Sequence, residues 1–194
     1  MTARMTTSVQ KPTISIALCT YNGKTYLPVQ WHSLMHQHQL PDEVVISDDC
    51  STDGTPDLLK QLAAEAPFTV RVLPNTTRLG YNKNFERAIA ACQGDLIFLC
   101  DQDDFWLPEK ISSMTQYMVQ HPEAQIAFCD AWVTDEYLDG REERFWRAVR
   151  FDEKAKNRWR AGEVMDVMLD GNRMMGCATV IRKSYLSMII PIPK

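Results

Sequence analysis

An apolar run that ends abruptly in acids constrains this chain more than any other feature. Residues 96–100 are all apolar and lead directly into Asp101, Asp103 and Asp104. Such a run is typical of a strand covered on both faces, as in a parallel sheet. Crowded carboxylates repel one another, and a divalent cation with hard oxygen ligands, Mg²⁺ or Mn²⁺, relieves that repulsion. A solvated acidic turn that caps the next helix is the alternative, because Asp is a favoured N-cap residue.

Strand-like and helix-like stretches alternate around this run. We expect strands at 13–19, 43–47, 68–73 and 96–100, and helices at 26–35, 56–66, 82–92 and 108–120. Strict alternation implies βαβ units, and therefore an α/β fold with a Rossmann-like, mostly parallel sheet flanked by helices. Further along, the pattern predicts strands at 124–133 and 175–181 and short helices at 163–169 and 184–189.

Three of the expected strands run into polar loops, at 20–23, 48–53 and 101–104. Open parallel sheets bind ligands outside the carboxyl ends of their strands. Helix caps account for one polar loop more easily than for three that converge on one edge. The sequence therefore favours a metal and nucleotide site at this edge.

Composition limits the other classes of function. The chain has 194 residues, 45% of them hydrophobic, and its net charge of −4 offers no broad basic field for nucleic acid. None of the six cysteines forms a CxxC pair, which predicts buried thiols in a reducing compartment. The tail at 1–12 lacks a signal-peptide core, and no apolar stretch reaches the ~20 residues that span a bilayer. We expect a cytoplasmic protein, with the option of docking at the inner face of the membrane.

The segment 141–160 has a composition of its own. Arginine recurs at every third position from Arg141 to Arg150, with Phe and Trp residues between. If the segment is helical, a basic face beside aromatic side chains suits phosphate or an anionic bilayer, which predicts a peripheral membrane contact. The alternative, which we favour, is a surface helix whose arginines pair with nearby acids.

Two other classes of function remain open from the residues alone. A phosphotransferase of the haloacid dehalogenase type also places Asp-x-Asp after a strand, and Asp101 and Asp103 match that spacing. Its acids normally follow the first strand, and this chain has Phe105 where that family has a Thr. A binding module that holds a nucleotide sugar without turnover is the other alternative.

Four blocks, taken in order, resemble the family-2 glycosyltransferases, in particular the bacterial branch that builds polysaccharide and O-antigen and includes rhamnosyltransferases. They are CTYNG at 19–23, ISDDCSTDGT at 46–55, LGYNKNF at 79–85 and DQDDFW at 101–106. The resemblance implies a glycosyltransferase A fold, with a nucleotide-sugar-binding half at 13–104 and an acceptor half at 105–194. It also implies metal-dependent, inverting transfer of a sugar from a nucleoside diphosphate to a glycan or lipid-linked acceptor.

The same resemblance assigns roles to single residues. Thr20, Tyr21 and Asn22 line the nucleotide pocket, Asp48 contacts the base with Asp49 beside it, and Asp101 lies near the ribose. Asp103 ligates the metal, with Asp104 close by. Arg78 and Lys83 are further candidates for nucleotide contact.

The catalytic base has no evident candidate in the sequence. The resemblance implies a His-Asp pair shortly after a segment like 175–183, and this chain has no such pair. We therefore expect the acceptor half to be truncated and the base to lie beyond Lys194, with Asp130 or Asp135 as substitutes.

Overall fold

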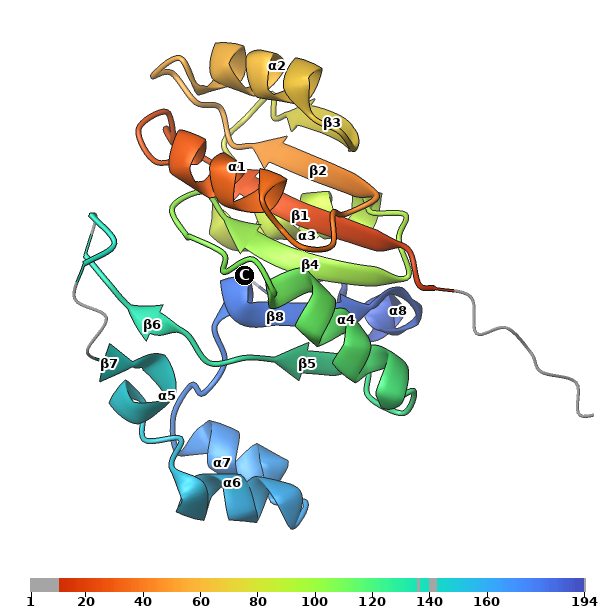
Figure 1. Ribbon diagram of the computed structural model, residues 1–194, viewed down its shortest axis with the longest axis vertical. Helices are drawn as coiled ribbons and strands as arrows, with labels where there is room; N and C mark the ends of the chain where they lie inside the picture. The colour runs from red at the N-terminus through yellow and green to blue at the C-terminus, as the bar shows by residue number, and fades with distance from the viewer. Residues whose placement is uncertain (1–10, 136, 140–142, 194) are drawn as a thin grey trace, which may run out of the picture.

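The computed structural model describes residues 11–135, 137–139 and 143–193. Its main sheet has six strands in the order β3-β2-β1-β4-β8-β5 (Figure 1). Four strands are parallel to one another: β1 (Ile14–Thr20), β2 (Glu43–Asp48), β3 (Thr69–Pro74) and β4 (Leu96–Asp101). β8 (Thr179–Arg182) runs antiparallel between β4 and β5 (Ile126–Phe128). The expected mostly parallel α/β sheet is confirmed.

Helices cover both faces of this sheet, as the apolar strand sequences predict. α1 (Leu27–Met35), α2 (Thr55–Glu65) and α4 (Lys110–Gln120) pack on one face, around buried Ile16, Leu18 and Phe98. α3 (Tyr81–Ala91) packs on the other face, against Ala17 and Ile97. Figure 1 shows α1 and α4 in front of the sheet and α3 behind it. Side chains that alternate along each strand therefore reach two separate cores.

Beyond the sheet, the chain forms a small outlying group of elements (Figure 1). A two-stranded ribbon, β6 (Trp132–Val133) with β7 (Glu143–Arg144), leads into α5 (Phe145–Ala148), α6 (Glu153–Arg160) and α7 (Val164–Leu169). The chain then returns through a 3₁₀ turn, η1 (Gly176–Ala178), into β8. After β8, η2 (Lys183–Tyr185) and α8 (Leu186–Ile189) complete the described elements.

Two expectations about the second half are wrong. The strand expected at 124–133 is two strands, because the chain turns at Asp130, whose Oδ1 accepts hydrogen bonds from the amides of Ala131 and Trp146, each at 2.9 Å. The helix expected at 141–160 is two helices, because Arg150 takes the left-handed conformation with φ of 57° between them. Burial of the Phe151 ring, which is 5% exposed, accounts for this break.

Some expectations lie partly outside the described residues. The tail at 1–12 is described only at 11–12, and Arg141 of the basic segment is not described. The division at residue 104 stays a prediction, although β8 of the second half pairs directly with β4 of the first. All six cysteines are free, and four of them are buried. Along the described parts of the chain, no helix has the length and apolarity to cross a membrane.

Candidate active site at the carboxyl edge of the sheet

The polar loops after β1, β2 and β4 meet at one edge, as predicted. Parallel pairing sets Thr20 beside Asp48 and Cys19 beside Asp101. The Thr20 hydroxyl donates a 2.7 Å hydrogen bond to Asp48 Oδ1. Ser51 donates two more bonds to the same carboxylate, from its hydroxyl at 2.6 Å and its amide at 3.0 Å. Asp48 is buried, and its hydrogen bonds to Thr20 and Ser51 connect the loops that follow β1 and β2.

Asn22 strengthens this link from the other side. Its amide donates to the Ser51 hydroxyl at 2.9 Å, and its side-chain oxygen accepts from the Thr52 amide at 2.9 Å. The Asn22 backbone has φ of 48°, a conformation that Asn adopts more readily than most residues. Its side chain is therefore engaged by the second loop.

Asp49 organises a further loop, between β3 and α3. It accepts hydrogen bonds from the amides of Leu79 at 2.6 Å and Gly80 at 2.9 Å, and from the side chain of Asn75 at 2.8 Å. Burial acts to raise the pKa of Asp49, but these bonds outweigh it and hold the pKa below its usual value. The loop that carries Arg78 is thereby fastened to the end of β2.

Arg78 and Tyr21 form the exposed rim of the site. The Arg78 guanidinium carbon lies 3.8 Å from the centre of the Tyr21 ring. The Tyr21 backbone is held by Gln102, which accepts from its amide at 2.9 Å and donates to its carbonyl at 3.1 Å. A flat ring under a cation at the rim is suited to contact a base or a phosphate.

Lys83 lies in different surroundings. Its ammonium donates to Glu86 at 2.7 Å and to the carbonyl of Ile192 at 2.9 Å. Glu86 also accepts from the Ile192 amide at 2.6 Å. In this structure Lys83 therefore fastens the segment after α8 to α3.

Residues 101–104, which we call the acid loop, begin at the last residue of β4 and carry three carboxylates that do not lie together. Carboxylate oxygens of Asp101 and Asp104 and the sulfur of Cys177 lie within 4.8 Å of one another. The exposed Asp103 is not part of this group. Burial, followed by the charges of Asp104 and Asp103, raises the pKa of Asp101 to about 7. Tyr81 donates a long hydrogen bond of 3.4 Å to Asp101.

Asp104 and Lys110 lie at the inner end of this loop. Burial raises the pKa of Asp104, and the nearby Lys110 charge partly opposes it. Asp104 Oδ2 is buried and has no hydrogen-bond partner among the described residues. The Lys110 ammonium donates to the carbonyl of Cys177 at 2.6 Å and lies 3.7 Å from the centre of the Trp106 ring.

The residues of the acid loop suit a hard divalent cation. Adjacent carboxylates, one with an orphaned buried oxygen and one exposed, are the donors that Mg²⁺ and Mn²⁺ prefer. Sequence reasoning did not find Cys177 or Lys110, because contacts between distant segments leave no local pattern. Tyr81 stood inside a matched block, and its position in that block is the one signal that pointed to it.

Asp130 and Asp135, the two substitutes for a catalytic base, both accept hydrogen bonds from backbone amides in turns. Asp130 accepts the two amide bonds described above and lies 3.7 Å from Arg144. Asp135 accepts from the amides of Tyr137 at 2.9 Å and Asp139 at 3.0 Å. Neither lies in the carboxylate and thiol group of the acid loop.

A Rossmann-like sheet with acids and polar loops at its carboxyl edge defines the nucleotide-binding α/β class of protein. Comparison with known proteins identifies the family within this class. Residues 15–185 match the model of the glycosyl transferase family 2, and the chain belongs to that family. Membership in this family does not favour the alternative function, a phosphotransferase of the haloacid dehalogenase type.

Several relatives carry assigned names. The chain is 34% identical over 113 residues to the putative teichuronic acid biosynthesis glycosyltransferase TuaG of Bacillus subtilis, covering 57% of this chain and 43% of the relative. It is 32% identical over 106 residues to the dTDP-rhamnosyl transferase RfbG of Shigella flexneri, and the match covers 53% of this chain and 37% of the relative. An uncharacterized protein of Mycobacterium tuberculosis is 30% identical over 88% of this chain. The chain spans 47% of that relative, about half its length.

Solved structures confirm the glycosyltransferase A fold. A mannosyltransferase from Pyrobaculum calidifontis, in complex with GDP-Man and Mn²⁺, superposes with a TM-score of 0.67 at 18% identity. That match covers 95% of this chain and 48% of the other. TarS of Staphylococcus aureus, in complex with UDP, gives a TM-score of 0.53 at 25% identity over 59% of this chain and 34% of the other.

Proposed function

We propose that this chain is the donor-binding part of a metal-dependent glycosyltransferase. The donor is a nucleoside-diphosphate sugar, and the acceptor is a glycan or a lipid-linked saccharide. One observation carries the proposal: loops after three parallel strands meet at a single edge around the acids that follow β4. Family membership and the nucleotide-bound structures of the two neighbours, one with UDP and one with GDP-Man and Mn²⁺, support it.

The loops divide the work of binding the donor. Asp48, held by Thr20 and Ser51, and Asn22 shape the pocket for the base, with Asp49 fixing the neighbouring loop. Tyr21 and Arg78 form its outer wall. We assign the ribose contact to Asp101, which lies 3.4 Å from the Tyr81 hydroxyl. Lys83 reaches the donor only if it leaves Glu86 and Ile192.

Asp103 and Asp104 are our assignment for the metal, Mg²⁺ or Mn²⁺. A bound cation would neutralise charge on the leaving diphosphate as a Lewis acid. Asp103 is exposed toward solvent, and Asp104 offers its unpaired Oδ2. Lys110 stays behind them, bound to the carbonyl of Cys177.

Inverting transfer needs a base that accepts the proton of the acceptor hydroxyl. Asp130 and Asp135 hold turns together through backbone amides, so we assign the base to neither. A peripheral membrane contact through 141–160 remains a separate prediction. Its expected single helix does not form, and Arg144, Arg158 and Arg160 lie within 4.0 Å of carboxylates.

A thermal-shift screen of UDP-, GDP- and dTDP-sugars, each with and without Mn²⁺, tests the proposal. One donor should raise the melting temperature only with Mn²⁺, because binding to the folded state alone stabilises it. Release of free sugar from that donor by the chain would separate an enzyme from a binding module. If no donor raises the melting temperature under either condition, the proposal is wrong.

A further inference from the structure

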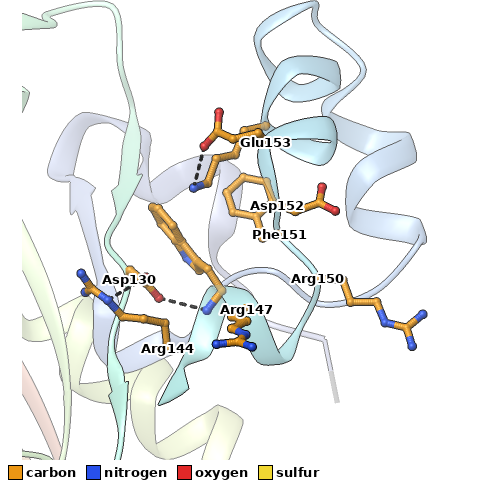
Figure 2. A pocket seen from close by; sticks show the side chains of 9 residues that line it. Asp130, Arg144, Arg147, Arg150, Phe151, Asp152 and Glu153 are labelled. Carbon is orange, nitrogen blue, oxygen red and sulfur yellow. Dashed lines mark hydrogen bonds and ion pairs between the residues drawn. The ribbon is translucent and has the colours of Figure 1, made fainter. Parts of the chain in front are cut away.

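A pocket of about 470 Å³ opens on the outlying group of elements (Figure 2). Its volume is in the range of small-molecule sites, roughly 300 to 1,000 Å³. The side chains that line it come from the turn after β5, from β7, from α5 and from the start of α6. We call it the Trp146 pocket, lined by Asp130, Arg144, Trp146, Arg147, Arg150, Phe151, Asp152, Glu153 and Lys156.

Aromatic rings form a rigid wall of this pocket. The rings of Trp146 and Phe151 meet edge to face, with centroids 5.2 Å apart and planes at 84°. Phe128 and Trp159 pack against Phe151 from the protein side, at 6.0 and 5.7 Å. The Trp146 indole nitrogen is buried, yet it has no hydrogen-bond partner in the part of the chain that the structure describes. An unpaired buried donor is costly, and a ligand acceptor would satisfy it.

In the charged lining, two acids already accept hydrogen bonds, whereas two arginines make no ion pair with a described acid. Asp152 caps α6 by accepting from the Ala155 amide at 2.9 Å, and Glu153 accepts from Lys156 at 3.2 Å. By contrast, Arg147 and Arg150 make no ion pair with any described acid. In Figure 2 no dashed line reaches either guanidinium. The pocket thus offers free donors beside carboxylates that still have acceptor capacity.

This mixture selects among ligand chemistries. A hydroxyl group both donates and accepts, so a polyhydroxylated ring can use arginines and carboxylates together. The lining carries four cations and three carboxylates, so a phosphate would pair with the cations but meet the charge of the carboxylates, and an acyl chain would leave all the charged groups without partners. Aromatic walls with a few polar groups that fix orientation are the usual composition of a small-molecule site.

A chain of contacts connects Asp130, in the lining of the pocket, to the candidate active site. Asp130 follows Cys129, whose amide donates to the carbonyl of Ala178 at 3.0 Å. Ala178 in turn follows Cys177, whose sulfur lies within 4.8 Å of carboxylate oxygens of Asp101 and Asp104. The lining of the pocket and the acid loop are therefore connected through the turn after β5 and through η1.

We propose that the Trp146 pocket binds a sugar ring of the acceptor, with Trp146 as its wall and Arg147 and Arg150 as hydrogen-bond donors. That the sugar belongs to the acceptor rests on the proposed function, whereas the binding of a sugar ring rests on the pocket alone.

Titration of ¹⁵N-labelled protein with methyl α-rhamnopyranoside, methyl α-mannopyranoside and methyl β-N-acetylglucosaminide tests the proposal. The indole N–H signal of Trp146 is assigned by its loss in Trp146→Phe. At least one glycoside should shift this signal while leaving that of Trp31, which is 4% exposed in the core, unchanged. Arg147→Gln and Arg150→Gln should each weaken binding about tenfold, the effect of losing one hydrogen bond to a charged group. Lys154→Gln, which removes an exposed cation of α6 outside the lining, is the matched control and should bind normally.

Three results would overturn the inference. One is that no glycoside shifts the Trp146 signal. Another is that inorganic pyrophosphate shifts it and the glycosides do not, which would make the pocket an anion site. The last is that vesicles of phosphatidylglycerol and phosphatidylcholine bind wild type but not Arg147→Gln, while glycosides do nothing. A parallel titration with UDP, GDP and dTDP plus Mn²⁺ separates the two proposals, because nucleotide binding without glycoside binding refutes only the pocket.

Discussion

The ammonium of Lys110 donates a 2.6 Å hydrogen bond to the carbonyl of Cys177, and so ties α4 to the turn that faces the acid loop. Its charge also lies close enough to Asp104 to oppose the rise in the pKa of that carboxyl group. This half-buried cation therefore fixes the position of a segment from the second half and offsets charge in the first.

Replacing Lys110 with Met should destabilise the protein. The variant loses a hydrogen bond from a charged donor, which contributes about 1.5–3 kcal/mol, and leaves Asp104 without a nearby cation. We expect the free energy of unfolding in urea to fall by about 2 kcal/mol. Lys60→Met is the control, because Lys60 forms an exposed pair with Asp57, and such pairs contribute about 1 kcal/mol or less. Equal effects of the two substitutions would contradict the role of Lys110.

The raised pKa of Asp101 predicts a pH dependence of stability. Burial, with the charges of Asp104 and Asp103, raises this pKa to about 7, whereas an unfolded Asp titrates near ~3.9. Between these values the folded state binds more protons than the unfolded state, so stability falls as pH rises through the window. We expect wild type to lose stability relative to Asp101→Asn from pH ~4 to ~7. Urea unfolding in EDTA at several pH values measures this, and parallel curves for the two proteins would refute it.

Asp49 should matter for stability as well as for the site. Asp49→Asn removes a charge-assisted acceptor from the amides of Leu79 and Gly80. The free energy of unfolding at neutral pH should fall by about 1–3 kcal/mol. Because hydrogen bonds lower the pKa of Asp49, this contribution is present above the unfolded pKa and is lost as pH falls through the folded one. Asp57→Asn, which changes an exposed acid on α2, is the control and should leave the free energy of unfolding nearly unchanged.

Lys83 and Arg78 should give opposite results. Lys83→Gln releases the carbonyl of Ile192, so hydrogen exchange at the amides of Ile190 and Ile192 should quicken while nucleotide affinity stays unchanged. Arg78→Gln should leave exchange at these two amides unchanged and weaken nucleotide binding several-fold, because Arg78 stands over Tyr21 at the rim. Loss of nucleotide affinity in Lys83→Gln would show instead that Lys83 reaches the donor.

The sheet could be predicted from sequence because a local run of apolar residues marks each strand. Apolar runs such as 96–100 mark covered strands, and the loops that follow them must meet wherever strands are parallel. The segment 141–160 resisted prediction because aromatic contacts between Phe128, Phe151 and Trp159 decide its shape, and these join residues distant in sequence. The same reason hides Cys177 and Lys110 from a sequence pattern.

The central claim is that the acid loop after β4 holds a nucleoside diphosphate through a divalent cation. Calorimetric titration of the chain with the diphosphate of its preferred donor, with Mn²⁺ and then with EDTA, tests this most directly. Wild type should bind at least about tenfold more tightly with Mn²⁺, a difference of about 1.4 kcal/mol, and Asp103→Asn should lose that gain while Asp57→Asn keeps it. Equal affinity of wild type and Asp103→Asn in Mn²⁺ would contradict the claim.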